Sequence, residues 1–210
     1  MEKDIKVLLL VGGSAYHDQP EHREILSGFI GAKFDLTMTD DLGVLDPDTL
    51  NKYSVIVNYT TFVEPSNEQV TAMINAVRNG KGFVGIHGAS ATFWNSPAYL
   101  DMIGGKFIVH DPNKEFLVQI NGVGAVVPHP ITKGIENFKI QDELYIIEGD
   151  ITQWEIIARA EGHPIIFNKM YGKGRVHNNA LGHDARALNN PSFQKLIVNG
   201  IMWASCLLLV

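Results

Sequence analysis

Short apolar runs alternate with helix-spaced apolar positions through the first half of the chain. Val7–Val11, Val55–Val57 and Gly82–Ile86 are almost wholly apolar, which is typical of strands buried on both faces of a parallel sheet. Pro20–Ile30 carries apolar residues at helical spacing, and Phe34–Met38 alternates as a strand does. This succession of strands and helices predicts a doubly wound α/β fold.

A second helix is predicted between the third and fourth strands. Pro65-Ser66-Asn67-Glu68 is typical of a helix start with a serine cap, and Asn79-Gly80 is typical of a helix end. Between them, the apolar positions that form one stripe are Val70, Met73, Ile74 and Val77. The spacing therefore predicts a crossover helix that packs on the sheet.

The pattern changes after about Gly104, where strand-like runs follow one another. The runs are Phe116–Ile120, Val126-Val127, Leu144–Ile147, Ile156–Ala160, Ile165–Phe167 and Arg175–Leu181. A final helix is expected at about Ser192–Trp203. We predict a mostly parallel, doubly wound sheet flanked by helices, with extra β-strands in the second half. Because no repeat or linker interrupts residues 1–210, we expect a single domain.

Composition and charge exclude several classes of protein. The 17 Lys and Arg residues against 23 Asp and Glu give a net charge of −6, which argues against a nucleic-acid binder. No run is long enough to span a membrane, and the N-terminal apolar run does not resemble a signal peptide. A single cysteine, Cys206, allows no internal disulfide, so we expect a cytoplasmic protein. The apolar end Cys206–Val210 packs back on the domain or forms a homodimer contact.

Three of the eight histidines follow predicted strands. His17 follows the first strand, His87 the fourth and His183 a late one. Ligands of open α/β sheets bind beyond the carboxyl ends of the strands, so these imidazoles can converge there. Imidazole titrates near neutral pH and binds zinc. The alternative is that each histidine is a solvated loop residue or hydrogen-bonds a core carbonyl.

His87 lies in a segment that resembles a nucleophile elbow. In Gly85-Ile86-His87-Gly88-Ala89 a histidine stands where serine or cysteine would stand, between the small residues that a tight, strained turn requires. Covalent acyl chemistry through this residue is therefore not expected.

Other candidate groups are less specific. Asp142-Glu143-Leu144-Tyr145 places paired carboxylates beside a strand. These carboxylates could act as general acid and base or as metal ligands, or they could simply belong to a solvated acidic turn. Gly172-Lys173-Gly174-Arg175 predicts a hairpin turn and not a phosphate loop. Gly12-Gly13-Ser14 is only a fragment of a dinucleotide fingerprint, so no nucleotide cofactor is expected.

Several motifs, taken together and in order, resemble one family. They are Gly82–Phe93, Tyr99, Ile103–Phe107, His110-Asp111-Pro112, His129–Gly134, Asp142–Tyr145, Tyr171–Val176, Leu181–Asp184 and Gly200–Ala204. This combination is similar to the signature of ThuA-like proteins, the trehalose-utilisation family, and covers almost the whole chain.

The resemblance implies a fold like that of class I glutamine amidotransferases. In those enzymes a cysteine occupies the elbow and a late histidine completes the site; here His87 and His183 take these two positions. The missing cysteine implies that glutaminase activity is not inherited. One departure is His177, where a larger aromatic or apolar residue is expected, so the pocket wall could be more polar.

Two functions follow as hypotheses, one catalytic and one not. The first is an enzyme that breaks down trehalose, a related disaccharide or a 3-keto-sugar. It would be a hydrolase or an isomerase. It would work either with a divalent metal, for which zinc is the first choice, or without a metal. The second is a non-catalytic carbohydrate-binding or regulatory protein, in which Trp94, Tyr99 and Trp154 stack on sugar rings. A nicotinamide-dependent oxidoreductase is disfavoured because the glycine fingerprint is absent.

Specific roles are assigned to residues under the catalytic hypothesis. The catalytic residues are predicted to be His87, His183 and Glu143. The predicted substrate-binding residues are His17, Trp94, Tyr99, Asp142, Tyr145 and Arg175. The predicted metal ligands are His17, His87, His110 and His183.

Overall fold

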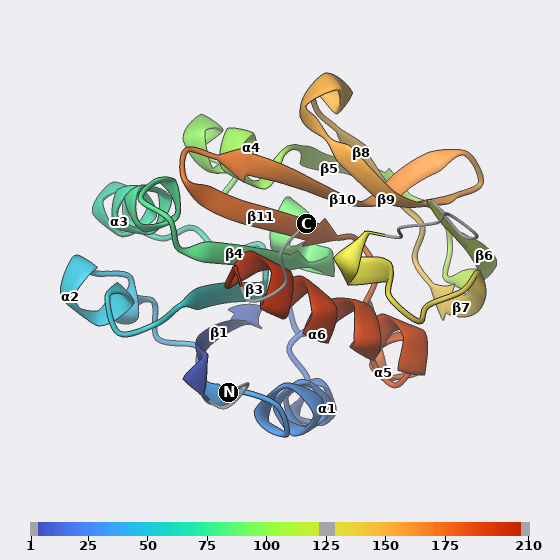
Figure 1. The fold of residues 1–210 in the computed structure, drawn as a ribbon, viewed down its shortest axis with the longest axis horizontal. Coiled ribbons are helices and arrows are strands. Elements are labelled where there is room, and N and C mark those ends of the chain that lie inside the picture. The colour runs from blue at the N-terminus through green and yellow to red at the C-terminus, as the bar shows by residue number, and fades with distance from the viewer. Residues whose placement is uncertain (1–3, 122–128, 207–210) are drawn as a thin grey trace.

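A nine-stranded sheet forms the centre of the computed structural model, which describes residues 4–121 and 129–206 (Figure 1). The strand order is β2-β1-β3-β4-β11-β10-β9-β6-β7, and β5 and β8 form a separate two-stranded sheet. The strands are β1 (Lys6–Gly13), β2 (Asp35–Thr39), β3 (Val55–Thr61), β4 (Gly82–Ile86), β5 (Lys106–His110), β6 (Lys114–Ile120), β7 (Phe138–Asp142), β8 (Tyr145–Glu148), β9 (Glu155–Ala160), β10 (His163–Tyr171) and β11 (Gly174–Asn179).

The large sheet has a parallel half and an antiparallel half. Strands β2, β1, β3, β4 and β11 run parallel to one another. A tight turn then reverses the chain between β10 and β11, whose register pairs Tyr171 with Gly174. Strands β10, β9, β6 and β7 continue the sheet with antiparallel pairing. The C-terminal ends of five strands therefore share one edge, and the extra strands extend the sheet beyond it.

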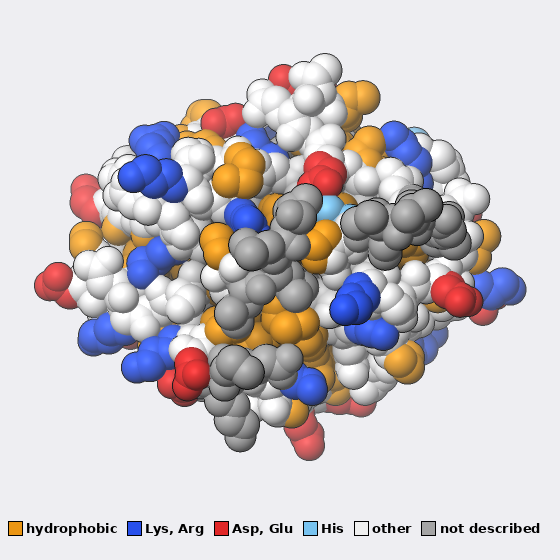
Figure 2. All heavy atoms as spheres, viewed as in Figure 1, with side chains coloured by type: hydrophobic (Ala, Val, Ile, Leu, Met, Phe, Trp, Pro, Cys, Tyr) orange, Lys and Arg blue, Asp and Glu red, His pale blue; other side chains and the backbone are white. Residues whose placement is uncertain are grey.

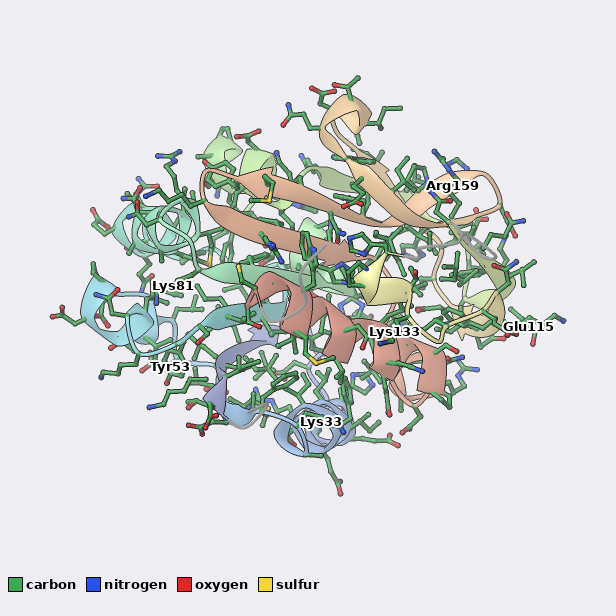
Figure 3. All side chains as sticks on the ribbon, in the orientation of Figure 1. Lys33, Tyr53, Lys81, Glu115, Lys133 and Arg159 are labelled. Carbon is green, nitrogen blue, oxygen red and sulfur yellow. The ribbon has the colours of Figure 1, made fainter. Side chains whose placement is uncertain are left out.

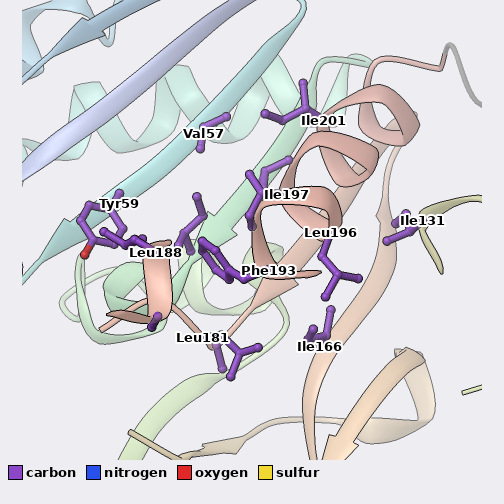
Figure 4. Packing of buried hydrophobic residues seen from close by; sticks show 14 of the residues in the cluster. Val57, Tyr59, Ile131, Ile166, Leu181, Leu188, Phe193, Leu196, Ile197 and Ile201 are labelled. Atoms are coloured by element: carbon purple, nitrogen blue, oxygen red, sulfur yellow. The ribbon is translucent and has the colours of Figure 1, made fainter. Parts of the chain in front are cut away.

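Helices cover both faces of the parallel half. They are α1 (Pro20–Gly31), α2 (Pro47–Leu50), α3 (Asn67–Arg78), α4 (Pro97–Ile103), α5 (Ala185–Leu188) and α6 (Pro191–Ala204). In Figure 1, α1, α5 and α6 lie on one side of the strands, and α2, α3 and α4 lie towards the other side. Apolar residues of α6 such as Phe193, Ile197 and Ile201 face Val57 of β3 in one core (Figure 4).

Strand side chains alternate between two cores. Leu9 and Val57 belong to the cluster beneath α1 and α6, whereas Leu8 and Ile56 belong to the cluster beneath α3 and α4. Because both faces are covered, these strands are apolar at successive positions and are fully buried. This burial explains the continuous apolar runs of the sequence.

Most elements that the sequence predicts are present. The parallel strands, the helices at Pro20, Asn67 and Pro191 and the β10–β11 hairpin are confirmed, and Ser66 forms the capping box that begins α3. Strands β5 and β7 and helices α2, α4 and α5 were not predicted. Strand β5 is mostly exposed and therefore has a weak apolar pattern. The expected strand at Val126-Val127 lies outside the described residues.

The edge of the sheet where the parallel strands begin is tied by side chains. Lys81, just before β4, donates a hydrogen bond of 2.6 Å to the carbonyl of Tyr53, just before β3, and both are labelled in Figure 3.

On the face shown in Figure 2, Lys and Arg side chains are interspersed with acidic ones. Within residues 4–121 and 129–206, no helix has the length and apolar character needed to cross a membrane.

Candidate active site

Three histidines meet at the C-terminal edge of the parallel strands. His17, His87 and His183 come from the segments that follow β1, β4 and β11. His17 Nε2 lies 2.9 Å from His183 Nδ1 and 3.3 Å from His87 Nε2. The predicted convergence of these three imidazoles is therefore confirmed, although the first and the last are 166 positions apart in the sequence.

Glu143 completes the cluster. Its Oε2 atom lies 3.1 Å from His183 Nδ1 and 3.7 Å from His87 Nε2. One ligand atom from each of these four residues lies within 4.8 Å of the others. The four ligands of a tetrahedral zinc ion, each about 2.0–2.1 Å from the metal, are about 3.4 Å apart. The geometry of the cluster is therefore suited to a metal of this kind.

The buried carboxylate of Asp142 holds two of these groups together. Its Oδ1 accepts hydrogen bonds from the backbone N–H groups of Glu143 (2.8 Å) and His183 (3.1 Å), and its Oδ2 accepts one from Gly182 (2.7 Å). Burial raises the pKa of Asp142. The end of β7 is thereby joined to the loop after β11, which places Glu143 beside His183.

Thr61, at the end of β3, orients His17. Its hydroxyl lies 3.0 Å from His17 Nδ1 and occupies the space beside Gly88, where a Cβ atom would overlap Thr61 Oγ1. His87 itself has a φ of 45°, a left-handed conformation that is costly for a residue with a side chain. The strained turn predicted for the elbow is therefore present, and Gly88 allows Thr61 to approach it.

Hydrogen bonds fix the orientation of the imidazole nitrogens. His87 Nδ1 lies 3.0 Å from the carbonyl oxygen of Ala180, which can only accept, so Nδ1 donates. In neutral His87, the lone pair of Nε2 then faces His17 and Glu143. Burial, together with the neighbouring imidazoles of His87 and His183, lowers the pKa of His17 to about 3. His17 is therefore neutral at physiological pH.

His183 and Glu143 behave as an ion pair. Burial opposes the charge of His183, but the hydrogen bond and negative charge of Glu143 outweigh it and raise the pKa of His183 above 6.5. Burial likewise opposes the charge of Glu143, and its contacts with His183 and His87 lower its pKa below the ordinary value. The cluster thus combines a basic imidazole with a neutral one.

The cluster forms the floor of a pocket of about 290 Å³. Its lining residues are Ser14, Tyr16, His17, Phe62, Phe107, His110, Glu143, Tyr145 and His183. His87 is fully buried behind them, with its ring 4.0 Å from that of Tyr145. A ligand in this pocket would contact His183 and Glu143 directly, whereas His87 lies behind them.

Three predicted substrate-binding residues lie elsewhere. Tyr99 is fully buried in α4, where its hydroxyl donates to Ala89 O (2.7 Å) and accepts from Asn58 (2.9 Å), so it supports the elbow from within the core. Arg175 is the second residue of β11, at the opposite edge of the sheet from His183, and donates to Trp203 O (2.9 Å). Asp142 is wholly buried and bonds backbone groups.

Other predicted residues lie near the cluster without joining it. His110 lines the pocket, and its Nδ1 is 3.6 Å from Glu143 Oε1. It was predicted as the fourth metal ligand, but the residue that joins the three histidines in the cluster is Glu143. Trp94 contacts Phe62 at the pocket mouth, with ring centroids 5.3 Å apart.

Two further residues that the sequence singled out lie in the interior. Trp154 stacks on Phe167 at 4.0 Å and donates to Gly104 O, away from the histidines. His177 is buried against α6 with Nδ1 bonded to Asn168, so it does not make the pocket wall more polar.

Sequence reasoning missed the aromatic residues around the pocket. Tyr16 and Phe62 are 79% and 57% exposed and line its mouth, and Phe107 forms part of its wall. A signal was available, because both Tyr16 and Phe62 lie in segments that directly follow parallel strands. Thr61 was also missed, although Gly88 marks the close approach to it.

One family model matches almost the whole chain. The model of the ThuA family, described as trehalose utilisation, matches residues 6–204. A search of curated proteins finds no match.

Solved structures share the fold. A ThuA-like protein from Parabacteroides merdae is 22% identical, with a TM-score of 0.79 over 96% of this chain and 90% of that chain. A cytoplasmic protein from Salmonella typhimurium is 14% identical, with a TM-score of 0.68 over 97% and 98% of the two chains. A β-galactosidase from Bacillus circulans is 12% identical, with a TM-score of 0.59 over 97% of this chain but 31% of that chain.

Replacement of Gly88 tests the packing behind the elbow. In Gly88→Ala, the added methyl group would displace Thr61, so we expect a loss of about 1–3 kcal/mol in the free energy of unfolding. In Gly28→Ala, a control in helix α1 with open space around the new Cβ, stability should be unchanged or higher by up to about 1 kcal/mol. Equal denaturation midpoints for Gly88→Ala and the wild type would contradict this account.

The role of Asp142 is tested by a change that conserves its size. Asp142→Asn turns one acceptor into a donor facing a backbone N–H. We therefore expect the free energy of unfolding to fall by about 1–3 kcal/mol. Asp46→Asn is the control, because Asp46 caps α2 at the surface and asparagine caps equally well. Chemical denaturation measures both variants, and similar losses in the two would refute a special role for Asp142.

The His183–Glu143 pair predicts a pH dependence in chelator-treated protein. The stabilisation that protonated His183 provides is complete below pH 6.5 and is lost as pH rises through its higher folded pKa. NMR titration of the imidazole nitrogens should therefore give His183 a pKa above 6.5, which falls in Glu143→Gln and not in the exposed control Glu148→Gln. An unchanged pKa in Glu143→Gln would show that the pairing is absent.

Proposed function

The chain belongs to the ThuA family, and on this premise we propose that its histidine pocket is the active site of a sugar-active enzyme. The proposed substrates are trehalose, a related disaccharide or a 3-keto-sugar, and the proposed reaction is hydrolysis or isomerisation. One observation carries the proposal: three imidazoles and one carboxylate converge at the floor of a pocket at the C-terminal edge of a parallel sheet.

In the metal-assisted form of the proposal, His17, His87, His183 and Glu143 hold a divalent ion, with zinc as the first choice. The set of three nitrogen donors and one carboxylate is one that zinc accepts. Such an ion would act as a Lewis acid towards a sugar oxygen or a water molecule. This form gives fully buried His87 a direct role, since its Nε2 lone pair faces the other three donors.

In the metal-free form, the pair formed by His183 and Glu143 performs acid–base catalysis. Both residues line the pocket, and the raised pKa of His183 allows it to deliver a proton to a leaving oxygen near neutral pH. Glu143 stabilises the imidazolium and then accepts a proton from an attacking water or a sugar carbon. His87 is then a positioning residue, because it contacts His17 and Glu143 but is not exposed to the pocket.

The second candidate is a non-catalytic carbohydrate-binding or regulatory protein on the same scaffold. It is favoured by the absence of serine or cysteine at the elbow and by the aromatic residues around the pocket.

If the fold is amidotransferase-like, the histidine at the elbow also removes glutaminase activity. We further propose a cytoplasmic location, no nucleotide cofactor and no nucleic-acid or membrane partner. The proposed homodimer contact, Cys206–Val210, lies mostly outside the described residues.

Turnover separates the two candidates. Purified protein is incubated with trehalose, related disaccharides and their 3-keto forms, and products are followed by NMR. We expect turnover of at least one sugar, lowered about 10²–10⁴-fold in His183→Gln and unchanged in His163→Gln, which alters an exposed histidine at the start of β10. Saturable binding without turnover in the wild type would favour the second candidate.

Elemental analysis separates the two catalytic forms. After mild dialysis, the metal-assisted form predicts nearly one zinc per chain and a loss of turnover with a chelator that added zinc restores. In His17→Gln the zinc content should fall, whereas in His163→Gln it should not. Absence of metal together with turnover that a chelator does not affect would leave only the metal-free form.

A further inference from the structure

We propose that Tyr16 and Phe62 form an outer subsite that binds the second ring of a disaccharide. The inference rests on the proposed function, because it assigns a sugar to the pocket that His183 and Glu143 line. It goes beyond that function because it divides the site into two subsites and names the residues of the outer one.

The size of the pocket supports a division into two parts. Its volume of about 290 Å³ is just below the range of about 300–1,000 Å³ for small-molecule sites. A pocket of this size is suited to one sugar ring over the catalytic groups. The second ring of a disaccharide would then lie at the mouth of the pocket, which Tyr16 and Phe62 line.

Both side chains are largely exposed, and both line the same pocket. Tyr16 is 79% exposed and Phe62 is 57% exposed. Trp94, a further exposed aromatic residue, lies with its ring 5.3 Å from that of Phe62. Exposed aromatic residues gathered at one mouth are typical of a ligand site, and their flat faces suit the apolar face of a sugar ring.

The backbone of Phe62 gives an independent observation. Its φ is 56°, in the left-handed region that disfavours a bulky residue and favours glycine. Its N–H donates to the carbonyl of Ala91, the last residue of the elbow turn, at 3.0 Å. The fold thus holds an exposed phenylalanine in a strained conformation next to the catalytic groups, and strain of this kind is a feature of functional sites.

Neighbouring contacts keep the Phe62 ring in place. Trp94 meets it edge to face, Trp94 N donates to Glu64 Oε1 at 2.7 Å, and Lys106 lies over the Trp94 ring at 5.2 Å. Trp94 therefore supports the outer subsite and does not itself line the pocket. This arrangement gives Trp94, predicted from the sequence to bind substrate, a positioning role.

Binding of trehalose and glucose tests the subsite. By titration calorimetry, we expect wild-type protein to bind trehalose roughly tenfold more tightly than glucose, because only trehalose has a second ring to stack. Phe62→Ala should lose this difference and leave glucose affinity unchanged, whereas Phe62→Trp should retain it. Tyr16→Ala should reduce the difference. Ile151→Ala is the control, because Ile151 is also 57% exposed but lies outside the pocket lining.

Two results would overturn the proposal in distinguishable ways. If wild-type protein binds both sugars and Phe62→Ala changes neither affinity, or weakens both equally, the outer subsite is refuted while the proposed function stands. If wild-type protein binds neither trehalose nor glucose, the subsite is also refuted, whereas the proposed function, which includes other disaccharides and 3-keto-sugars, is decided by the turnover assay.

Thermal unfolding provides a readout that does not depend on sugar. If Phe62 is retained for binding, its truncation should hardly lower the melting temperature, and Phe62→Gly should melt at or above Phe62→Ala because glycine relieves the left-handed strain. A fall of about 5 °C or more in both variants would show instead that Phe62 is retained for stability.

Discussion

The hydrogen bonds that the carboxylate of Asp142 accepts hold the other groups of the site in position. This carboxylate is fully buried at the end of β7 and accepts three backbone N–H groups, two of them from the loop after β11. A buried carboxylate is costly unless hydrogen bonds compensate it, and these bonds form only when the two segments lie together. The antiparallel extension of the sheet is thereby joined to the edge of its parallel half, so that Glu143 meets His183.

Once Glu143 is in place, the electrostatics of the cluster follow. His17 lies within hydrogen-bonding distance of both other imidazoles, and burial together with these neighbours opposes its protonation. One carboxylate stabilises one imidazolium, that of His183, while His17 stays neutral. The site therefore presents a proton donor and unprotonated nitrogens in one small volume, an arrangement suited to acid–base catalysis or to a metal.

The sequence was sufficient to predict the parallel strands and the convergence of the histidines. Strands buried on both faces have continuous apolar runs, and histidines directly after such strands share one edge of the sheet. That Glu143 and not His110 is the fourth member of the cluster was not predictable in this way, because the position of Glu143 depends on the pairing of β7 and on Asp142. Tyr99 and Arg175 were misplaced because a motif position does not say whether a side chain faces the pocket, the core or the opposite edge.

Backbone strain in the structure indicates the position of the site more directly than the amino-acid composition does. The left-handed conformations of His87 and Phe62 lie at the ends of β4 and β3, and both residues belong to the site or its mouth. The sequence explained the glycine after His87 only by the tight turn, whereas in the structure this glycine also allows the close approach of Thr61. The exposed aromatic residues around the mouth became apparent only when the loops after several strands were seen together.

A crystal structure of the protein soaked with trehalose or its 3-keto form would show whether a sugar occupies the histidine pocket. We expect electron density for a sugar ring in the pocket, in contact with His183 and Glu143, with the second ring against Phe62. Ordered sugar elsewhere, for instance in the cavity of about 220 Å³ beside Trp154 and Lys169, with the histidine pocket left to solvent, would contradict this expectation.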